Sequence, residues 1–288
     1  MRLRPGEKEG DPAVLDAEPD GALGLSSSVV TSAAGTPEDV GLERPPGSAD
    51  VRLSGTIPIG GQWDGELAVS DPAQHAVAAL ARALSARGIR VTGGTATTRE
   101  PLPAGVRVLA AHESPPLAEI IRVVNKDSRN LHAEMLLRLV GSRQKGEGSA
   151  AKGHEAVVER LERLGISPEG WNLADGSGLA RTNLVTPRGL VALLAAMERH
   201  PYAAAFRDSL AVAGRDGTLE KRMRGTAAEG NVAAKTGTLS LVNALAGYAT
   251  TPRGERLAFV LMVNNHAGRG REALKALDDA AAAIAASR

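Results

Sequence analysis

The chain has 288 residues, of which 43% are hydrophobic and only six are Trp, Tyr or Phe, so its core must be aliphatic. A formal net charge of +1, without any dense Lys/Arg cluster, argues against nucleic-acid binding. Cysteine is absent, which excludes disulfides and thiol catalysis. The six histidines are scattered, so we expect neither a metal site nor a cofactor.

No export or membrane signal is visible in the sequence. The N-terminal stretch MRLRPGEKEG has arginines but no apolar segment behind them, so we expect no signal peptide in this chain. The longest apolar runs, such as LVALLAAM and LAFVLMV, are far shorter than a membrane span. We therefore expect no membrane-spanning helix.

The first 70 residues are rich in Gly, Pro, Ser and Asp, which predicts short strands and loops, most clearly in VRLSGTIPIGG. A helix should follow over residues 71–88. Asp71 is its expected N-cap, Pro72 suits its first turn, and Gly88 follows its end. A strand in IRVTGG and a loop to about residue 112 should come next.

The second half predicts helices near residues 131–140, 154–164, 187–199 and 271–286. Four apolar side chains of the first of these helices should face inward: Leu131, Met135, Leu136 and Leu139. Between the last two helices lie three strand-like runs, NVAAKTGT, LVNALAGYAT and RLAFVLMVN, and the turn TPRGE should join the last two into an antiparallel hairpin. This pattern predicts an α+β fold, in which an antiparallel sheet has flanking helices.

The sequence KTGT places a lysine and two hydroxyls on a predicted strand. Side chains alternate along a strand, so Lys235 and Gly237 should point to one face, and Thr236 and Thr238 to the other. Gly237 would let a ligand come close to the backbone. One interpretation is the wall of a cleft that binds a carboxylate. The other is a polar edge strand on which the lysine only prevents aggregation.

Two other polar stretches draw attention. Ser128 and Asn130 stand just before an apolar helix, where Ser and Asn are also ordinary helix caps. Asp175 begins the turn Asp-Gly-Ser-Gly. That turn is not the G-x-S-x-G elbow of hydrolases, so Ser177 is not a candidate nucleophile.

These segments, in this order, resemble the D-alanyl-D-alanine carboxypeptidase/endopeptidase family of penicillin-binding proteins, which are relatives of the serine β-lactamases. The similar segments are NKDSRNLHAEMLLRLVG, DGSGLARTNLVTP and AAKTGTLSLVNALAGY. The resemblance covers nearly the whole chain, most specifically from about residue 112 to 265. It implies an incomplete β-lactamase/DD-peptidase-like domain over residues 112–288, preceded over residues 1–111 by part of a small β-rich accessory region.

The resemblance also implies catalytic roles. Ser128 would help to shuttle a proton, Asn130 would contact the substrate amide, and Lys235 would keep the site positive and tune Ser128. We therefore expect the ammonium of Lys235 to lie beside Ser128 and Asn130.

Substrate binding is implied for the strand itself. Thr236 and Thr238 would meet a terminal carboxylate, Gly237 would leave the backbone open, and the Thr238 N–H would form half of an oxyanion hole. The implied substrate is a peptidoglycan stem peptide ending in D-Ala-D-Ala, and β-lactams would inhibit the complete enzyme. A complete family member would work outside the cytoplasm, in the cell envelope or secreted.

The nucleophile of the family pattern, Ser-x-x-Lys, should precede the Ser-x-Asn segment. The spacing occurs at Ser142 and at Ser149, both after that segment and within the Gly-rich GSRQKGEGSAAKG, which predicts a flexible connector. If the intervening residues are helical, Ser142 lies roughly 21 Å from Ser128. We therefore expect the nucleophile to be absent from this chain, through truncation, a miscalled start, or natural loss of catalysis.

An absent N-terminal portion leaves three functional hypotheses open. The chain could represent a serine-type DD-peptidase, a remnant that binds peptidoglycan or β-lactams without acylation, or a fragment without an independent role. The helix near residues 131–140 would also lose a packing partner, so we expect a chain that is poorly stable or that associates.

Overall fold

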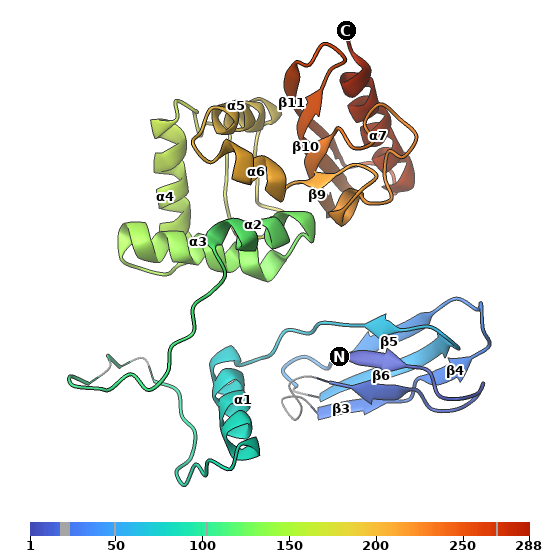
Figure 1. Ribbon diagram of the computed structural model, residues 1–288, viewed down its shortest axis with the longest axis vertical. Helices are drawn as coiled ribbons and strands as arrows, with labels where there is room; N and C mark the ends of the chain where they lie inside the picture. The colour runs from blue at the N-terminus through green and yellow to red at the C-terminus, as the bar shows by residue number, and fades with distance from the viewer. Residues whose placement is uncertain (18–23, 49, 99, 102, 269) are drawn as a thin grey trace. The chain divides into compact units, whose positions relative to one another are not determined.

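The computed structural model of the protein describes residues 1–17, 24–48, 50–98, 100–101, 103–268 and 270–288 (Figure 1). The chain divides into two compact units, Met1–Leu109 and Ala110–Arg288. The assignment of residues 1–111 to an accessory region and of residues 112–288 to the peptidase domain stays a prediction.

The first unit contains two small sheets around one aliphatic core. Its strands are β1 (Arg2–Arg4), β2 (Val14–Asp16), β3 (Gly24–Ser27), β4 (Val30–Ser32), β5 (Asp39–Glu43), β6 (Asp50–Pro58) and β7 (Trp63–Asp64). One sheet has the antiparallel order β2-β1-β7, and in the other β6 pairs in parallel with β3 and β4 and antiparallel with β5. Leu3, Val29, Leu53 and Ile57 are buried together. The strand predicted in VRLSGTIPIGG is confirmed as β6.

Helix α1 (Pro72–Ala86) begins and ends as the sequence predicts. The carboxylate of Asp71 accepts the backbone N–H of Gln74 at 2.9 Å, and Gly88 follows with φ +76°. The strand predicted in IRVTGG is wrong, because residues 89–94 form no strand. Ile89 and Val91 are exposed there, so neither side chain is packed against a sheet, as a strand of this kind requires.

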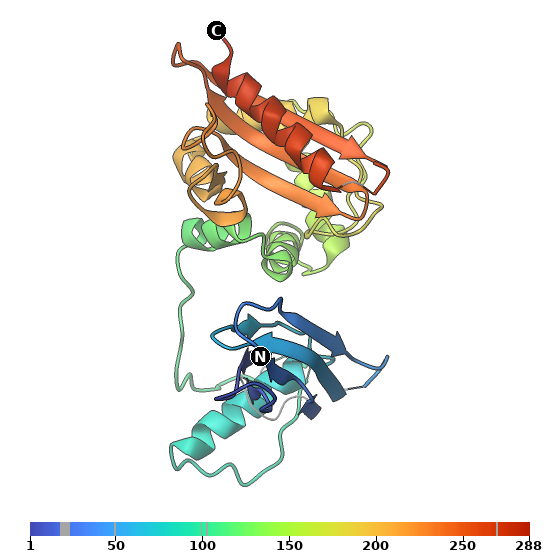
Figure 2. The ribbon, with the colours of Figure 1, turned by 90° about the vertical axis from the view of Figure 1, so that its right-hand side faces the viewer.

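The second unit is an antiparallel sheet flanked by helices. Its elements are α2 (Leu117–Lys126), α3 (Asn130–Lys145), α4 (Ala150–Arg163), α5 (Pro187–Glu198), α6 (Ala203–Ser209), β8 (Ala211–Val212), the 3-10 turn η1 (Gly217–Leu219), β9 (Ala233–Leu239), β10 (Val242–Thr250), β11 (Arg256–Asn264) and α7 (Gly270–Ala286). The strand order is β11-β10-β9-β8. Figure 2 shows α7 lying across one face of this sheet. The three predicted strands and the hairpin between the last two are confirmed.

Both faces of the sheet are covered by apolar side chains. Leu245 on β10 is fully buried in the cluster that includes Leu277 and Ala281 of α7. On the opposite face, Tyr248 packs with Leu194 of α5, and the Tyr248 hydroxyl donates to the Leu194 carbonyl oxygen at 2.7 Å. Because side chains alternate along a strand, β9 presents one set of residues to each face.

The Gly-rich segment between α3 and α4 is shorter than expected. The prediction of a flexible connector over residues 141–153 is wrong, because α3 continues to Lys145 and α4 begins at Ala150. A Cβ on Gly153 would lie 2.4 Å from the carbonyl oxygen of Leu137, and a Cβ on Gly141 would lie 2.7 Å from the Gly153 nitrogen. These glycines therefore allow the two helices to pack closely.

The inward face of α3 also differs from the prediction. Leu131, Met135 and Leu139 are 71%, 55% and 49% exposed, Leu136 is half-buried, and Leu137 is 9% exposed. Leu137 contacts the Gly153 position of α4 and lies where a Cβ on Gly176 would be only 2.9 Å away. Helix α4 and the loop at Gly176 thus cover the face of Leu137, which leaves the predicted face of α3 open.

The core of the sheet should respond strongly to truncation. We expect Leu245→Ala to lower the free energy of unfolding by about 2–5 kcal/mol, because it leaves a cavity under α7. Leu131→Ala, the same change at an exposed site, should stay within about 0.5 kcal/mol of the wild type. Urea unfolding followed by circular dichroism measures both, and equal losses would contradict the observed burial.

The open face of α3 should promote association. Three exposed apolar side chains at helical spacing, Leu131, Met135 and Leu139, favour self-association of the purified chain. A double substitution, Met135→Lys with Leu139→Glu, should reduce the associated fraction in size-exclusion chromatography with light scattering. A monomer with a sharp cooperative melt in the unsubstituted chain would contradict this expectation.

Candidate active site

The side chains of Lys235 and Ser128 meet, although they are 107 positions apart in the chain. Lys235 lies on β9, and Ser128 lies in the short link between α2 and α3 with φ +56°. The Lys235 ammonium donates to the Ser128 hydroxyl oxygen at 2.8 Å and to the Thr236 carbonyl oxygen at 2.7 Å. A serine in the left-handed region is uncommon, and such residues cluster at functional sites.

The C-terminal end of α2 is fixed to the segment that leads into the sheet. The Asn125 amide donates to the Ser209 hydroxyl at 2.8 Å, and the Lys126 ammonium pairs with the Asp216 carboxylate at 2.7 Å. A Cβ on Gly217 would lie 2.6 Å from the Lys126 carbonyl oxygen, so only a glycine allows this approach. These contacts hold Asp127 and Ser128, the two residues after α2, so that the Ser128 hydroxyl lies beside β9.

The electrostatic state of Lys235 is set by its surroundings. Burial lowers the pKa of the Lys235 amine below its ordinary value, because the charged form loses solvation. Both of the hydrogen bonds that Lys235 donates go to neutral oxygens, one of them on Ser128. An anion that docked beside this ammonium would therefore gain a strong, poorly screened interaction.

Ser128 and Asn130 do not act as ordinary helix caps. The N-cap residue of α3 is Arg129, and no side chain caps the helix there. Asn130 is the first residue of α3 and is exposed. Among the described residues, its amide has no hydrogen-bond partner. The capping interpretation of this polar stretch is therefore wrong, and the amide of Asn130 is available next to Ser128 in the chain.

Two hydroxyls near the end of β9 are hydrogen-bonded to neighbouring side chains. The Thr236 hydroxyl lies 2.9 Å from the Thr218 hydroxyl of η1, and the Thr238 hydroxyl accepts the Asn243 amide of β10 at 3.3 Å. Gly237 is exposed between them. A Cβ at Gly237 would make only an ordinary contact at 3.6 Å, so packing within the sheet does not require a glycine there.

The loop that begins at Asp175 is held rigidly by its own carboxylate. Asp175 accepts the N–H groups of Gly178 at 2.6 Å and Ala180 at 2.8 Å, and the Asn183 amide at 3.0 Å. Burial alone would raise the pKa of Asp175, but these hydrogen bonds, led by that of Asn183, hold it below its ordinary value. The Asp175 carboxylate is therefore occupied within the loop, which is a turn as predicted.

The same loop connects α3 with the β9–β10 hairpin. The Glu134 carboxylate of α3 accepts the Gly176 N–H at 2.7 Å, and the Arg181 guanidinium donates to the Ser240 carbonyl oxygen at 3.1 Å. The loop therefore holds α3, which begins two residues after Ser128, close to the hairpin that carries Lys235.

The lysines of the two Ser-x-x-Lys matches pair with carboxylates. Ser149 caps α4 by accepting the N–H of Lys152 at 3.2 Å, and the Lys152 ammonium pairs with Glu155 at 2.6 Å. The Lys145 ammonium lies 3.1 Å from the Glu155 carboxylate and pairs also with Glu159. Neither lysine is thus left with a free ammonium that could activate its serine.

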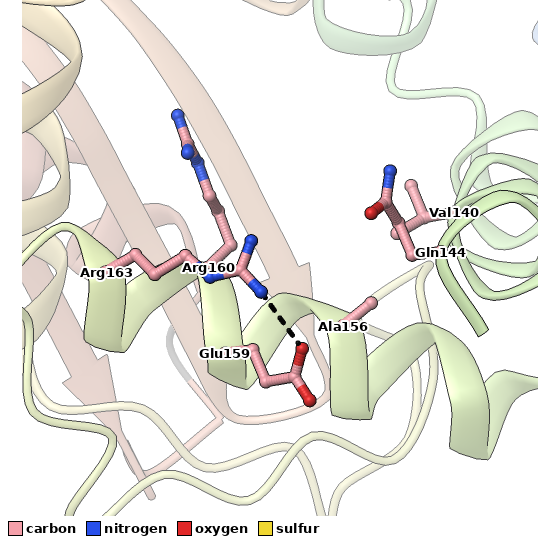
Figure 3. A pocket seen from close by; sticks show the side chains of 6 residues that line it. All are labelled: Val140, Gln144, Ala156, Glu159, Arg160 and Arg163. Atoms are coloured by element: carbon pink, nitrogen blue, oxygen red, sulfur yellow. Dashed lines mark hydrogen bonds and ion pairs between the residues drawn. The ribbon is translucent and has the colours of Figure 1, made fainter.

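A separate cavity of about 310 Å³ opens between α3 and α4 (Figure 3). It is lined by Val140, Gln144, Ala156, Glu159, Arg160 and Arg163. Val140 is ten positions along α3 from Asn130, which corresponds to roughly 15 Å. This cavity is therefore distinct from the site at Ser128.

Two further features of the described part of the chain concern metals and membranes. No three His, Asp or Glu side chains within it gather closely enough to hold a metal ion. No helix within it combines the length and the apolar character that crossing a bilayer would need.

Sequence reasoning missed several residues of this region. Thr218 stands in a stretch that is typical only of a turn, so nothing in the sequence connects it with Thr236. Asn243 carried a signal, because it is a polar residue inside the apolar run LVNALAGY. Lys126 and Asp216 pair with each other although they are 90 positions apart, and no local pattern indicates such a pair.

The sequence and its fold are similar to those of known proteins. The D-alanyl-D-alanine carboxypeptidase of Actinomadura sp. (strain R39) is 40% identical over 268 residues, which cover 90% of this chain and 50% of that protein. The D-alanyl-D-alanine carboxypeptidase DacB of Haemophilus influenzae is 34% identical over 202 residues, covering 69% of this chain and 42% of that protein. The chain thus spans about half the length of the curated relatives that it matches.

The fold is that of a penicillin-binding protein. The crystal structure of penicillin binding protein 4 (dacB) from Haemophilus influenzae matches 99% of this chain and 65% of its own chain, with a TM-score of 0.77 at 24% identity. The predicted α+β fold of the β-lactamase/DD-peptidase type is thereby confirmed. A sequence profile of the D-Ala-D-Ala carboxypeptidase 3 (S13) family matches residues 1–287, and the chain belongs to that family.

Proposed function

We propose that this chain is part of a serine-type D-Ala-D-Ala carboxypeptidase or endopeptidase that hydrolyses peptidoglycan stem peptides through an acyl-enzyme. The observation that carries the proposal is the 2.8 Å contact between the Lys235 ammonium and the Ser128 hydroxyl. The names of the relatives, D-alanyl-D-alanine carboxypeptidases, support the reaction class.

In the proposed reaction, a nucleophilic serine attacks the carbonyl between two D-alanines. The C–N bond then breaks, the leaving D-alanine amine takes up a proton, and water later hydrolyses the acyl ester. Ser128 would relay that proton, and the hydrogen bond that its oxygen accepts from Lys235 supports this role. The lowered pKa of Lys235 brings the amine closer to proton exchange at neutral pH.

Recognition of the substrate falls to two groups of residues. The hydroxyls of Thr236 and Thr238, together with the positive charge of Lys235, would bind the terminal carboxylate of the peptide. The N–H of Thr238 would donate to the developing oxyanion, and Asn130 would bind the substrate amide. Thr218 would orient the Thr236 hydroxyl, which lies 2.9 Å from its own.

The nucleophile is not assigned to a residue of this chain. Ser142 and Ser149, which have the required spacing to a lysine, lie within or at the start of helices whose lysines are paired with carboxylates. This observation favours a second candidate function, in which the chain binds D-Ala-D-Ala ends or β-lactams reversibly and without acylation.

The proposed substrate also implies partners and a place of action. Peptidoglycan is the expected partner, and β-lactams are expected inhibitors of the whole protein. Since peptidoglycan lies outside the cytoplasm, the whole protein would act in the cell envelope or as a secreted protein.

Removing the ammonium of Lys235 should weaken binding of the peptide. We expect Lys235→Met to lower the affinity for diacetyl-L-Lys-D-Ala-D-Ala by about tenfold or more, because a hydrogen-bonded charge is lost. Lys221→Met, a change at an exposed lysine, is the matched control and should bind as the wild type does. Isothermal titration calorimetry measures both, and equal affinities would exclude the proposed site.

A fluorescent penicillin separates the two candidate functions. Labelling that survives denaturation would show that a nucleophile acts in this chain. Binding that is lost on denaturation, but that competes with the D-Ala-D-Ala peptide, would support the reversible binding function. Absence of both would leave the chain without either activity.

The affinity for the peptide should depend on pH in one direction. The carboxylate favours the ammonium form of Lys235, so binding should weaken as the pH rises through the pKa of that amine. Because burial lowers this pKa, the weakening should begin at a lower pH than an ordinary lysine, with a pKa near 10.5, would give. Titration calorimetry across alkaline pH measures the profile, and a flat profile in the wild type would contradict the role of Lys235.

A further inference from the structure

A chain of hydrogen bonds leads from the interior of the second unit to the end of β9. The Asn243 amide nitrogen lies 3.3 Å from the Thr238 hydroxyl, and the Asn243 carbonyl oxygen lies 3.0 Å from Nε2 of His266. Asn243 is 2% exposed and stands directly opposite Thr238 in the pairing of β9 with β10. His266 follows β11, and its backbone N–H donates to the Leu241 carbonyl oxygen.

We propose that Asn243 and His266 are positioning residues, which aim the proton of the Thr238 hydroxyl at the carboxylate of a bound peptide. The peptide as ligand rests on the proposed function above. The direction of the hydrogen bonds does not, because it follows from the orientation of the Asn243 amide, with its nitrogen toward Thr238 and its oxygen toward His266.

With the Asn243 nitrogen toward Thr238 and its oxygen toward His266, the direction follows from what each atom is able to do. A carbonyl oxygen only accepts, so Nε2 of His266 must carry the hydrogen that reaches Asn243. An amide NH₂ group only donates, so the Thr238 oxygen must accept. A hydroxyl has a single proton, and with its oxygen engaged from behind, the Thr238 proton is left for a group on the exposed side of the strand.

The surroundings of His266 favour the same direction. Its other ring nitrogen, Nδ1, is buried and has no hydrogen-bond partner among the described residues. A hydrogen on Nδ1 alone would leave a buried donor unpaired and would remove the donor to Asn243, both of which are unfavourable. The tautomer with hydrogen on Nε2 avoids both costs.

The location of Asn243 argues for a role beyond packing. It occupies a buried position on the face of β10 where Leu245, two positions on, is part of the core under α7. Burying an amide is costly unless it is fully hydrogen-bonded, and an apolar side chain at this position would avoid that cost. The amide instead makes Thr238 a donor, and a donor suits a carboxylate.

The tautomer of His266 gives a test that needs no ligand. Long-range ¹H–¹⁵N correlation spectra of the uniformly ¹⁵N-labelled chain report which ring nitrogen carries hydrogen, and the His266 signals are identified by their loss in His266→Gln. We expect hydrogen on Nε2. A neutral ring with hydrogen only on Nδ1 would overturn the proposal, whatever the chain binds.

Binding measurements test the consequence. The probes are diacetyl-L-Lys-D-Ala-D-Ala and its C-terminal amide, which lacks the carboxylate. Asn243→Asp places an acceptor where the amide donates, so it should take the Thr238 proton and lower the affinity for the acid by about tenfold or more. The affinity for the amide probe should change little.

Substitutions of His266 separate positioning from packing. His266→Gln keeps an N–H donor toward Asn243 and should retain most of the affinity for the acid probe, whereas His266→Leu should lose it. Melting curves confirm that each variant is folded. Unchanged affinity in Asn243→Asp and His266→Leu would overturn the positioning role.

The outcomes also distinguish the two levels of the proposal. If the wild-type chain binds neither probe, the proposed function fails, and the tautomer of His266 still decides the direction of the hydrogen bonds. If the wild type binds the acid probe and the variants bind it equally well, the proposed function stands and the positioning role fails.

Discussion

The candidate site depends on one interaction, the hydrogen bond from the partly buried ammonium of Lys235 to the hydroxyl of Ser128. A lysine amine loses solvation when it is buried, which lowers its pKa and makes its charge costly. The serine oxygen and one backbone carbonyl offset part of that cost, but neither is an anion. The unbalanced charge supports the proposed binding of a carboxylate at this place.

The remaining contacts of the unit hold the two partners at that distance. Lys126 and Asp216 fix the end of α2 to the segment before β9, and Gly217 allows the backbones to touch. The loop at Asp175 braces α3 against the β9–β10 hairpin. A hydrogen-bonded site of this kind tolerates little movement, since a displacement of about 1 Å at a reacting group is costly. Much of this hydrogen-bond and ion-pair network therefore holds Ser128 and Lys235 in position.

One face of α3 is exposed to solvent although it is apolar. Leu137 and the glycines at the α3–α4 crossing are covered, whereas Leu131 and Met135 are not. An exposed apolar face of that kind favours contact with other apolar surface. It belongs to the helix that follows Ser128 in the chain. The chain spans about half the length of its relatives.

The sequence by itself determined the elements whose signals are local: the cap at Asp71, the helix that starts at residue 187, the hairpin of β10 and β11, and the alternation that separates Lys235 from Thr236. It also indicated the family, because three polar segments occur in order. The family resemblance led us to expect Lys235 beside Ser128, and the tertiary structure gives their hydrogen bond. Only the tertiary structure decided that α3 turns Leu137 inward and that Asn243 links His266 to Thr238. The physical reason is that side-chain pairing and helix facing depend on which surfaces meet in space, and local propensity carries no record of partners that are many residues away.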